Sequence, residues 1–229
     1  MPLTIAARFN GPDDSAHGGY ACGLLAGGST GDVAVTLHAP PRLGRPLRTE
    51  HTGRRTHLWD GPGLVATAAP TRHRVAVLDP VDPVLARAAE PGFRGRERHP
   101  FPRCFACGTG RADGLRLAPG AVEGRPDVVA CTWTPQESML AGDGRVRAEV
   151  VWAALDCPSG WTTDMTTTPM VLGWMRAKIR ERPAAGRACV VVARLDDAGE
   201  HGITATSALH DDAGVLLAAA TTRWYPPRG

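Results

Sequence analysis

The chain contains one order of elements twice, and this repetition restricts its fold more than any other feature. Residues 41–47 (PRLGRPL) align with residues 183–189 (PAAGRAC), and each of these turns joins two strand-like runs. A short apolar stretch with helical character precedes each turn, at residues 18–26 and 149–156. A pair of strands around a Gly turn follows each one. We therefore expect two copies of one β-rich unit.

Short apolar runs separated by Gly and Pro predict many strands and few helices. The chain has 27 Gly and 20 Pro among its 229 residues. Alternating or strand-like runs predict strands at residues 32–38, 56–60, 64–68, 73–78, 127–133, 171–180, 188–195, 202–210 and 215–225. The run at 146–156 has a strand signal as well as helical character. A short helix is expected after Pro80. Residues 91–114 have no periodicity and are dense in Gly, Pro and Arg, which is typical of a linker. We therefore divide the chain into a first unit at 1–90, a linker at 91–114 and a second unit at 115–229.

The composition excludes several classes of protein. With 43% hydrophobic and 21% charged residues, the chain has an ordinary globular composition. No apolar run is long enough for a membrane span, and the N-terminal residues lack the features of a signal peptide, so we expect a cytoplasmic protein with no membrane partner. The net charge is +3 and the arginines are scattered, which argues against a nucleic-acid partner. Six cysteines in a chain of this length indicate buried thiols, a metal site or a reactive group rather than a disulfide scaffold.

Four segments, in this order, resemble the hotdog-fold acyl-thioesterases, and among them the double-hotdog proteins that carry two units in one chain. The segments are His17-Gly18-Gly19 before an apolar stretch, residues 35–47 (VTLHAPPRLGRPL), residues 101–120 with FPRCFACG and GLRLAPG, and residues 150–161 (VVWAALDCPSGW). The resemblance covers nearly the whole chain. It implies an α+β fold, a double hotdog of two curled antiparallel sheets that each wrap around a central helix.

In the PaaI-like members of the family that this chain resembles, the catalytic carboxylate is an Asp on the central helix. Aligning the ends of the two helical segments puts Asp156 at this position in the second unit and Ala26 in the first, and it sets Glu149 opposite Gly19. Paired hotdogs take the helix N-terminus of a site from one unit and the acid from the other. The resemblance therefore implies one site, built from residues 17–19 and Asp156.

Gly18 and Gly19 are candidate oxyanion donors, because the first N–H groups of a helix are unpaired and a Gly has no side chain to block a thioester carbonyl. The alternative is that the Gly pair only lets the chain turn tightly. Asp156 is the candidate general base or nucleophile. The alternative for Asp156 is a polar residue near the end of a short helix that Pro158 stops.

His17 and Glu149 complete the candidate site. His17 can orient a water or bind the thioester carbonyl, and it can equally cap the helix or lie in solvent. Glu149 is a weaker candidate, since a Glu in the first turn of a helix is favourable for the helix dipole alone. Trp152 and Trp161 line an acyl pocket or belong to the core. Cys157 has no obvious His partner in sequence, so we interpret it as a small buried hydrophobe.

Cys104 and Cys107 form a CxxC motif, whose thiolates can bind one metal ion. A structural zinc site needs four ligands, and the sequence has no second CxxC. His99, Cys131 or Cys157 would have to complete the site through the fold. We therefore assign no metal. A buried structural role is the first interpretation, zinc is the second, and redox chemistry lacks its usual βαβ context.

Hydrolysis of an acyl thioester is the function that the resemblance implies. Coenzyme A or a phosphopantetheine arm is then part of the substrate, and no further cofactor is required. The partners to consider are an acyl carrier protein and a second copy of the chain in a homodimer. Two alternatives stay open: a non-hydrolytic acyl-binding module, which the missing acid of the first unit favours, and other acyl chemistry such as dehydration on the same fold.

Overall fold

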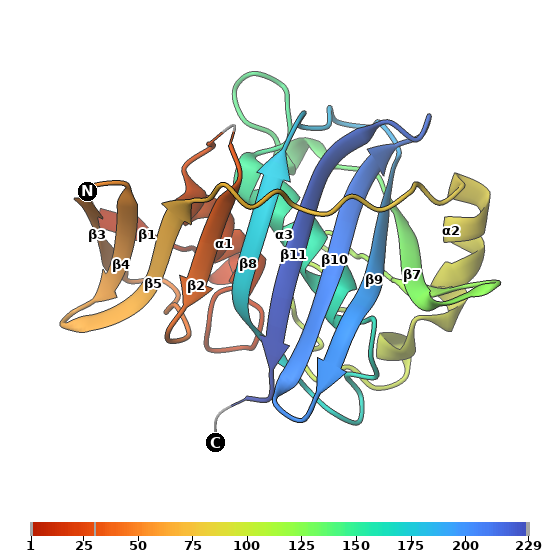
Figure 1. Cartoon of the computed structure of the whole chain (residues 1–229), viewed down its shortest axis with the longest axis horizontal. Helices are drawn as coiled ribbons and strands as arrows, with labels where there is room; N and C mark the ends of the chain where they lie inside the picture. Colours follow the sequence, from red (N-terminus) through yellow and green to blue (C-terminus); the bar gives the residue numbers. More distant parts are fainter. Residues whose placement is uncertain (1, 30, 228–229) are drawn as a thin grey trace.

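The computed structural model describes residues 2–29 and 31–227, and its central feature is one antiparallel sheet of eleven strands (Figure 1). The strands are β1 (Pro2–Thr4), β2 (Val33–Leu37), β3 (Pro46–Thr52), β4 (Arg55–Asp60), β5 (Gly63–Pro70), β6 (Gly120–Val122), β7 (Arg125–Trp133), β8 (Val171–Ile179), β9 (Cys189–Gly199), β10 (Gly202–Asp211) and β11 (Leu216–Tyr225). Their order in the sheet is β1-β3-β4-β5-β2-β8-β11-β10-β9-β7-β6. The strands predicted from the sequence are confirmed, except the one at residues 73–78 and the strand signal at 146–156, where the structure has a helix.

The sheet has the same strand order on both sides of the β2–β8 pair. β2 and β8 are antiparallel, with Val33 opposite Ala177 and Val35 opposite Met175. From this seam the order is β5-β4-β3-β1 on one side and β11-β10-β9-β7 on the other, so each strand of the first half has a counterpart in the second. The repeated order of elements that the sequence predicts is therefore visible in the sheet.

The repeated turns adopt the same conformation in both halves. Gly44 and Gly186 both have φ +69°, a left-handed conformation that a side chain disfavours. The Gly44 amide donates to the Ile5 carbonyl at 2.8 Å, and the Gly186 amide donates to the Pro135 carbonyl at 3.0 Å. This is the physical reason why Gly recurs in the two aligned turns.

Two helices lie on one face of the sheet and pack against each other (Figure 1). α1 (Gly18–Ala26) ends where Gly27 adopts φ +62° and its amide donates to the Leu24 carbonyl. In α3 (Ala148–Gly160) every residue from 150 to 160 is buried, which explains its apolar composition on all sides. A third helix, α2 (Pro83–Ala89), confirms the short helix expected after Pro80 and begins at the capping residue Asp82.

Pro158 does not end α3, contrary to the sequence prediction. The helix continues to Gly160, so Pro158 lies inside it. A proline in a helix interior costs about 3 kcal/mol, because it removes one hydrogen bond and crowds the preceding turn. The neighbouring carbonyls of this turn have side-chain donors: the Ser207 hydroxyl donates to the Leu155 carbonyl at 2.7 Å, and the Ser159 hydroxyl donates to the Asp156 carbonyl at 2.6 Å.

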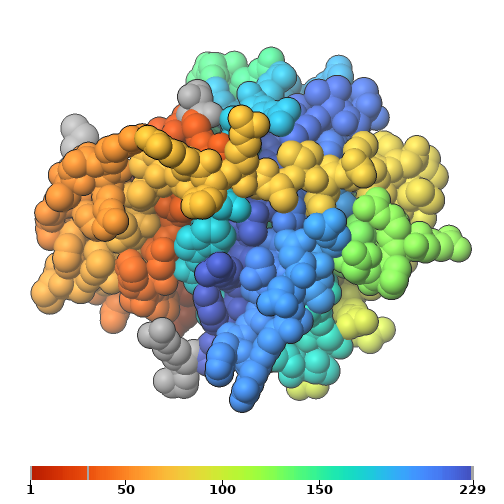
Figure 2. Space-filling model, viewed as in Figure 1, coloured from red at the N-terminus to blue at the C-terminus, as the bar shows by residue number. Residues whose placement is uncertain are grey.

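Residues 71–82, which we call the strap, cross the opposite face of the sheet from β5 to α2 (Figures 1 and 2). The predicted strand at residues 73–78 is wrong, because a segment that runs across strands cannot form a ladder with them. Its apolar residues serve another purpose: Leu78 and Val81 are buried in one cluster with Val190 and Val192 of β9. The alternation in the sequence thus reflects contact with a sheet face.

Residues 91–114 contain no strand, and they pack into the protein. The four residues 104–107 are all buried. The Phe105 amide donates to the Asn10 carbonyl at 2.7 Å, and the Leu115 and Leu117 amides donate to the Phe105 and Ala106 carbonyls. The segment therefore places the CxxC motif near the start of α1. None of the helices in the described residues is both long and apolar enough to span a membrane.

Candidate functional site

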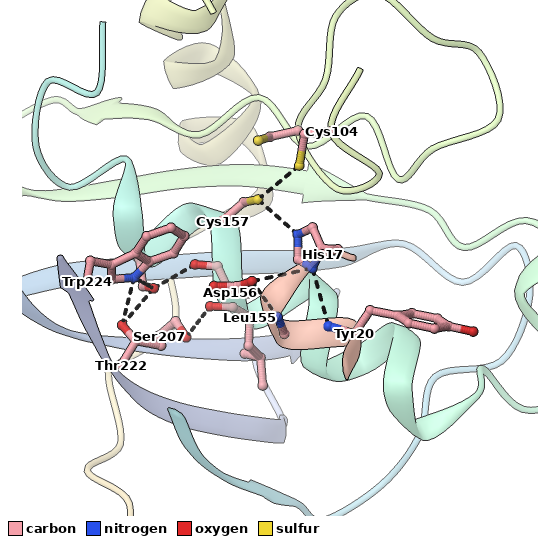
Figure 3. Close-up of polar contacts among 12 residues, drawn as sticks. His17, Tyr20, Cys104, Leu155, Asp156, Cys157, Ser207, Thr222 and Trp224 are labelled. Carbon is pink, nitrogen blue, oxygen red and sulfur yellow. Dashed lines mark hydrogen bonds and ion pairs between the residues drawn. The ribbon is translucent and has the colours of Figure 1, made fainter. Parts of the chain in front are cut away.

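The first turn of α1 meets Asp156 of α3 at the junction between the two halves (Figure 3). The Gly19 amide donates a hydrogen bond to Asp156 Oδ2 at 2.7 Å. Asp156 is 1% exposed, and its Oδ1 has no hydrogen-bond partner among the described residues. The structure thus brings together two candidate residues that lie 137 positions apart.

His17 caps α1 and lies between Asp156 and a cysteine. Its Nδ1 is 3.3 Å from the Tyr20 amide nitrogen and 3.3 Å from Asp156 Oδ2. Its Nε2 is 3.2 Å from Cys157 Sγ. Because Nδ1 either accepts from Tyr20 or donates to Asp156, the partner of Nε2 decides which tautomer is present. The side chain is buried, so His17 does not lie in solvent.

Burial and neighbouring charges act on this pair in opposite directions. Burial raises the pKa of Asp156 to about 6, although His17 and the Gly19 amide both lower it. Burial lowers the pKa of His17, but the Cys104 thiolate and the Asp156 carboxylate outweigh it, so the pKa is raised. The Asp156 carboxylate therefore favours the protonated form of His17, and a protonated His17 favours the ionised form of Asp156.

The glycines at the start of α1 are required by close packing. A Cβ at Gly19 would lie 2.5 Å from Asp156 Cβ, and a Cβ at Gly23 would lie 2.5 Å from Glu149 Cα. A Cβ at Gly18 would lie 2.9 Å from Leu172 Cβ. Gly19 and Gly23 are one helical turn apart and face α3, which is a spacing that sequence reasoning overlooked. The Gly19 amide, expected to face a substrate, faces Asp156 instead.

Glu149 lies outside this junction. It is seven residues from Asp156, so the two lie about 10 Å apart along the helix axis. Its carboxylate is 3.8 Å from Arg147 Nε, and its backbone packs on Gly23. Glu149 begins α3 at the position that corresponds to Gly19 in α1, where the alignment of the halves predicts it.

His17, Cys104 and Cys157 form a buried cluster beside Asp156 (Figure 3). The ligand atoms of His17, Cys104 and Cys157 all lie within 4.8 Å of one another. Cys104 Sγ is 3.6 Å from Cys157 Sγ. The second cysteine of the motif, Cys107, is also buried. The sequence prediction proposed Cys157 as a partner of the CxxC motif but did not consider His17.

The pKa values of Cys104, Cys107 and Cys157 are shifted in different directions. Contacts with Cys107 and Cys157 lower the pKa of Cys104 well below its ordinary value. Burial, together with Cys104, raises the pKa of Cys107 well above its ordinary value. Contacts with Cys104 and Cys107 raise the pKa of Cys157 in the same way. Of these three cysteines, Cys104 is therefore the one whose thiolate form is favoured.

The other residues suggested for a metal site have different neighbours. Cys131 lies in β7, where burial raises the pKa of its thiol to about 12. The His99 ring packs edge-on against Phe93 and Trp161, and its Nδ1 accepts from the Phe101 amide at 2.9 Å. The Trp161 indole donates to Cys107 Sγ at 3.4 Å. Trp161 is thus a core residue that also supports the CxxC motif.

A cleft of about 410 Å³ opens beside Cys107. Its lining includes two arginines, Arg96 and Arg116, and Glu90, which is held by the Thr132 amide and hydroxyl. Arg116 has φ +58°, and it is the non-glycine residue with positive φ among the described residues. Such a conformation is uncommon for a residue with a side chain and is often found at functional sites.

Comparison with known proteins identifies the fold. A conserved protein of unknown function with a hotdog fold from Alicyclobacillus acidocaldarius is 13% identical, with a TM-score of 0.61, and the match covers 100% of this chain and 93% of that chain. The chain therefore has a hotdog fold, as the resemblance predicts. No family model and no curated protein matches the sequence.

Shorter solved proteins match about half of the chain. The PaaI protein of the phenylacetic acid degradation operon of E. coli is 12% identical with a TM-score of 0.45, covering 50% of this chain and 82% of that chain. A protein from Streptococcus mutans, solved with bound acetyl CoA, is 15% identical with a TM-score of 0.42, covering 44% of this chain and 82% of that chain.

Proposed function

We propose that this chain, which has the hotdog fold, is a double hotdog that hydrolyses acyl thioesters carried on coenzyme A or phosphopantetheine. In this proposal residues 1–90 and 115–229 are the two hotdog units, and residues 91–114 connect them. The observation that carries the proposal is the contact between Gly19 and Asp156. It joins the helix N-terminus of one half to the acid of the other, as the resemblance to PaaI-like thioesterases implies.

Asp156 has one oxygen available for chemistry. Oδ2 accepts from Gly19, whereas Oδ1 has no partner among the described residues. In the proposed reaction this carboxylate takes a proton from a water, the hydroxide attacks the thioester carbon, and the C–S bond breaks as the thiol leaves with a proton. Direct attack by the carboxylate, followed by hydrolysis of the acyl-aspartate, uses the same residue.

The α1 amides are the proposed donors for the oxyanion. The helix dipole is positive at this end, and unpaired amides there stabilise negative charge on the thioester oxygen. Because Gly19 donates to Asp156, a bound substrate has to displace this hydrogen bond. The Asp156 carboxylate would thereby be released for its role as a base when the substrate arrives.

A second candidate function is acyl binding without hydrolysis. Its support is the burial of Asp156, which is 1% exposed and already engaged by Gly19. An assay of thiol release over a panel of aliphatic and aromatic acyl-CoAs separates the two functions. Release of free thiol by the native chain supports the hydrolase. Binding of an acyl-CoA without release on the whole panel supports the binding module.

Each chain is expected to bind one substrate. The Gly19 and Asp156 pair occurs once, because the corresponding positions hold Glu149 and Ala26. A non-hydrolysable thioether analogue of an acyl-CoA should therefore saturate at one tight equivalent per chain in calorimetry. Two tight and equal sites per chain would contradict the pairing of Gly19 with Asp156 as the basis of the site.

The cleft beside Cys107 is the proposed binding region for the phosphates of the carrier. Arg116→Gly removes the charge and suits the positive φ of this position, so it tests the side chain without backbone strain. We expect KM for an acyl-CoA to rise about three- to tenfold, the range for a charge-assisted hydrogen bond at an exposed site, with kcat little changed. The exposed Arg98, which does not line the cleft, provides the control Arg98→Gly. An equal effect of both substitutions would contradict this assignment.

A further inference from the structure

We propose that His17, Cys104, Cys107 and Cys157 together bind one zinc ion. The inference concerns atoms that the proposed hydrolysis does not use. It begins from the cluster beside Asp156, where the ligand atoms of His17, Cys104 and Cys157 converge from three separate segments of the chain (Figure 3). Cys107, the second cysteine of the CxxC motif, is buried as well and is the proposed fourth ligand.

The distances within the cluster match the edges of a zinc tetrahedron. Zn–S bonds of about 2.3 Å and Zn–N bonds of about 2.0 Å imply S···S separations of about 3.8 Å and S···N separations of about 3.5 Å. The Cys104 and Cys157 sulfurs are 3.6 Å apart, and His17 Nε2 is 3.2 Å from Cys157 Sγ. These three ligand atoms are thus separated nearly as ligands of one ion are, with a small expansion of the N···S edge. In the proposed site Cys107 moves into the fourth position when the ion binds.

The chemistry of the four side chains selects the metal. Three thiolates and an imidazole in a tetrahedral arrangement favour zinc, and four protein ligands form a closed site of the structural type. All four residues are buried, and the cysteines are free rather than bridged by disulfides. Thiols are weak hydrogen-bond donors and acceptors, whereas a divalent cation binds their thiolates directly.

Asp156 occupies the position of an outer-shell partner to this site. When Nε2 of a histidine binds zinc, the proton lies on Nδ1, and that nitrogen commonly donates to a carboxylate. His17 Nδ1 is 3.3 Å from Asp156 Oδ2. Zinc would therefore fix the tautomer in which His17 donates to Asp156 rather than accepting from Tyr20, and it would orient the carboxylate.

The site would also fasten an irregular segment to the two helices. Cys104 and Cys107 belong to residues 97–119, which have no helix or strand, whereas His17 caps α1 and Cys157 lies in α3. A segment without regular structure pays a conformational entropy cost when it becomes ordered. Metal binding offsets such a cost, because the ligands are brought together only in the folded state.

Metal content of the native full-length chain tests the proposal directly. The chain is purified without chelator or added metal, and every transition metal is measured by mass spectrometry. We expect about one zinc per chain. Cys157→Ser should lose most of this zinc. The matched control Cys131→Ser, which changes another buried cysteine that lies in β7, should retain it.

A second measurement begins with the native chain, whose spectrum does not depend on the folding of a variant. Native zinc is removed by a chelator and replaced by Co²⁺, which should give the intense charge-transfer and visible bands of tetrahedral cobalt thiolate. Their loss in His17→Gln, with the Cys131→Ser spectrum unchanged, would support the assigned ligands. A native chain that contains no stoichiometric zinc and takes up neither zinc nor Co²⁺ would overturn the proposal, as would stoichiometric iron in place of zinc.

The metal proposal and the proposed hydrolysis can fail separately. A chain that contains zinc and releases no thiol retains the site and loses the hydrolase function. A chain that releases thiol and binds no metal retains the hydrolase function and loses the site.

Discussion

Asp156→Asn is expected to lower the rate of thioester hydrolysis by about two orders of magnitude or more, with the fold intact. The substitution keeps the shape of the side chain, and its amide oxygen can still accept from the Gly19 amide. It removes the charge that a base or a nucleophile needs. The measurement is kcat for the best acyl-CoA of the panel, together with circular dichroism and zinc content to verify that the fold and the cysteine cluster are unchanged.

Glu149→Gln is the matched control for this prediction. It also neutralises a carboxylate on α3, but Glu149 lies two helical turns away and contacts Arg147. We expect a rate close to that of the native chain. If Glu149→Gln abolishes turnover while Asp156→Asn keeps it, the assignment of Asp156 as the catalytic acid or base is wrong.

Gly23→Ala is expected to lower the free energy of unfolding by about 2 kcal/mol, within the range for overpacking a core. The new Cβ would lie 2.5 Å from Glu149 Cα and 2.9 Å from Trp152 Cβ, so α1 and α3 would have to move apart. Alanine gains about 1 kcal/mol in helix propensity, which is too little to offset this strain. For a domain of this size, the melting temperature should fall by about 4 to 8 °C, measured by calorimetry.

Gly142→Ala controls for the loss of a glycine as such. A Cβ at this position meets no atom within 4 Å, and the residue is exposed. We therefore expect a melting temperature close to that of the native chain. An equal fall for both variants would show that the close approach of the helices is not the cause.

The sequence predicts the elements whose signal is local. Apolar periodicity identifies the segment that becomes α1 and most strands, and the two similar turns predict the repeated order because a left-handed Gly is needed in both. The alignment of the two helical segments, together with the family resemblance, also implies that residues 17–19 and Asp156 meet, and the Gly19 amide donates to Asp156. These features depend on spacing within a segment or on comparison of one half with the other.

The sequence does not predict features that depend on distant segments. His17 and Cys157 are 140 positions apart, and no spacing rule connects them. The helix ends after Pro158 rather than before it, since buried contacts from β10 support the interrupted turn. The sequence shows that Gly19 and Gly23 are four residues apart, but only the structure shows that both pack against α3.

The seam between β2 and β8 lies within one chain, and this has a consequence for how the two halves separate. Subunits of a non-covalent dimer dissociate on dilution, because their association depends on concentration. Here β2 and β8 belong to one chain, and the strap is part of the chain that connects them. Because Leu78 and Val81 of the strap are buried, this connection is itself part of the folded structure. Formation of the seam is therefore a first-order step, and diluting the protein leaves its contribution to the melting temperature unchanged.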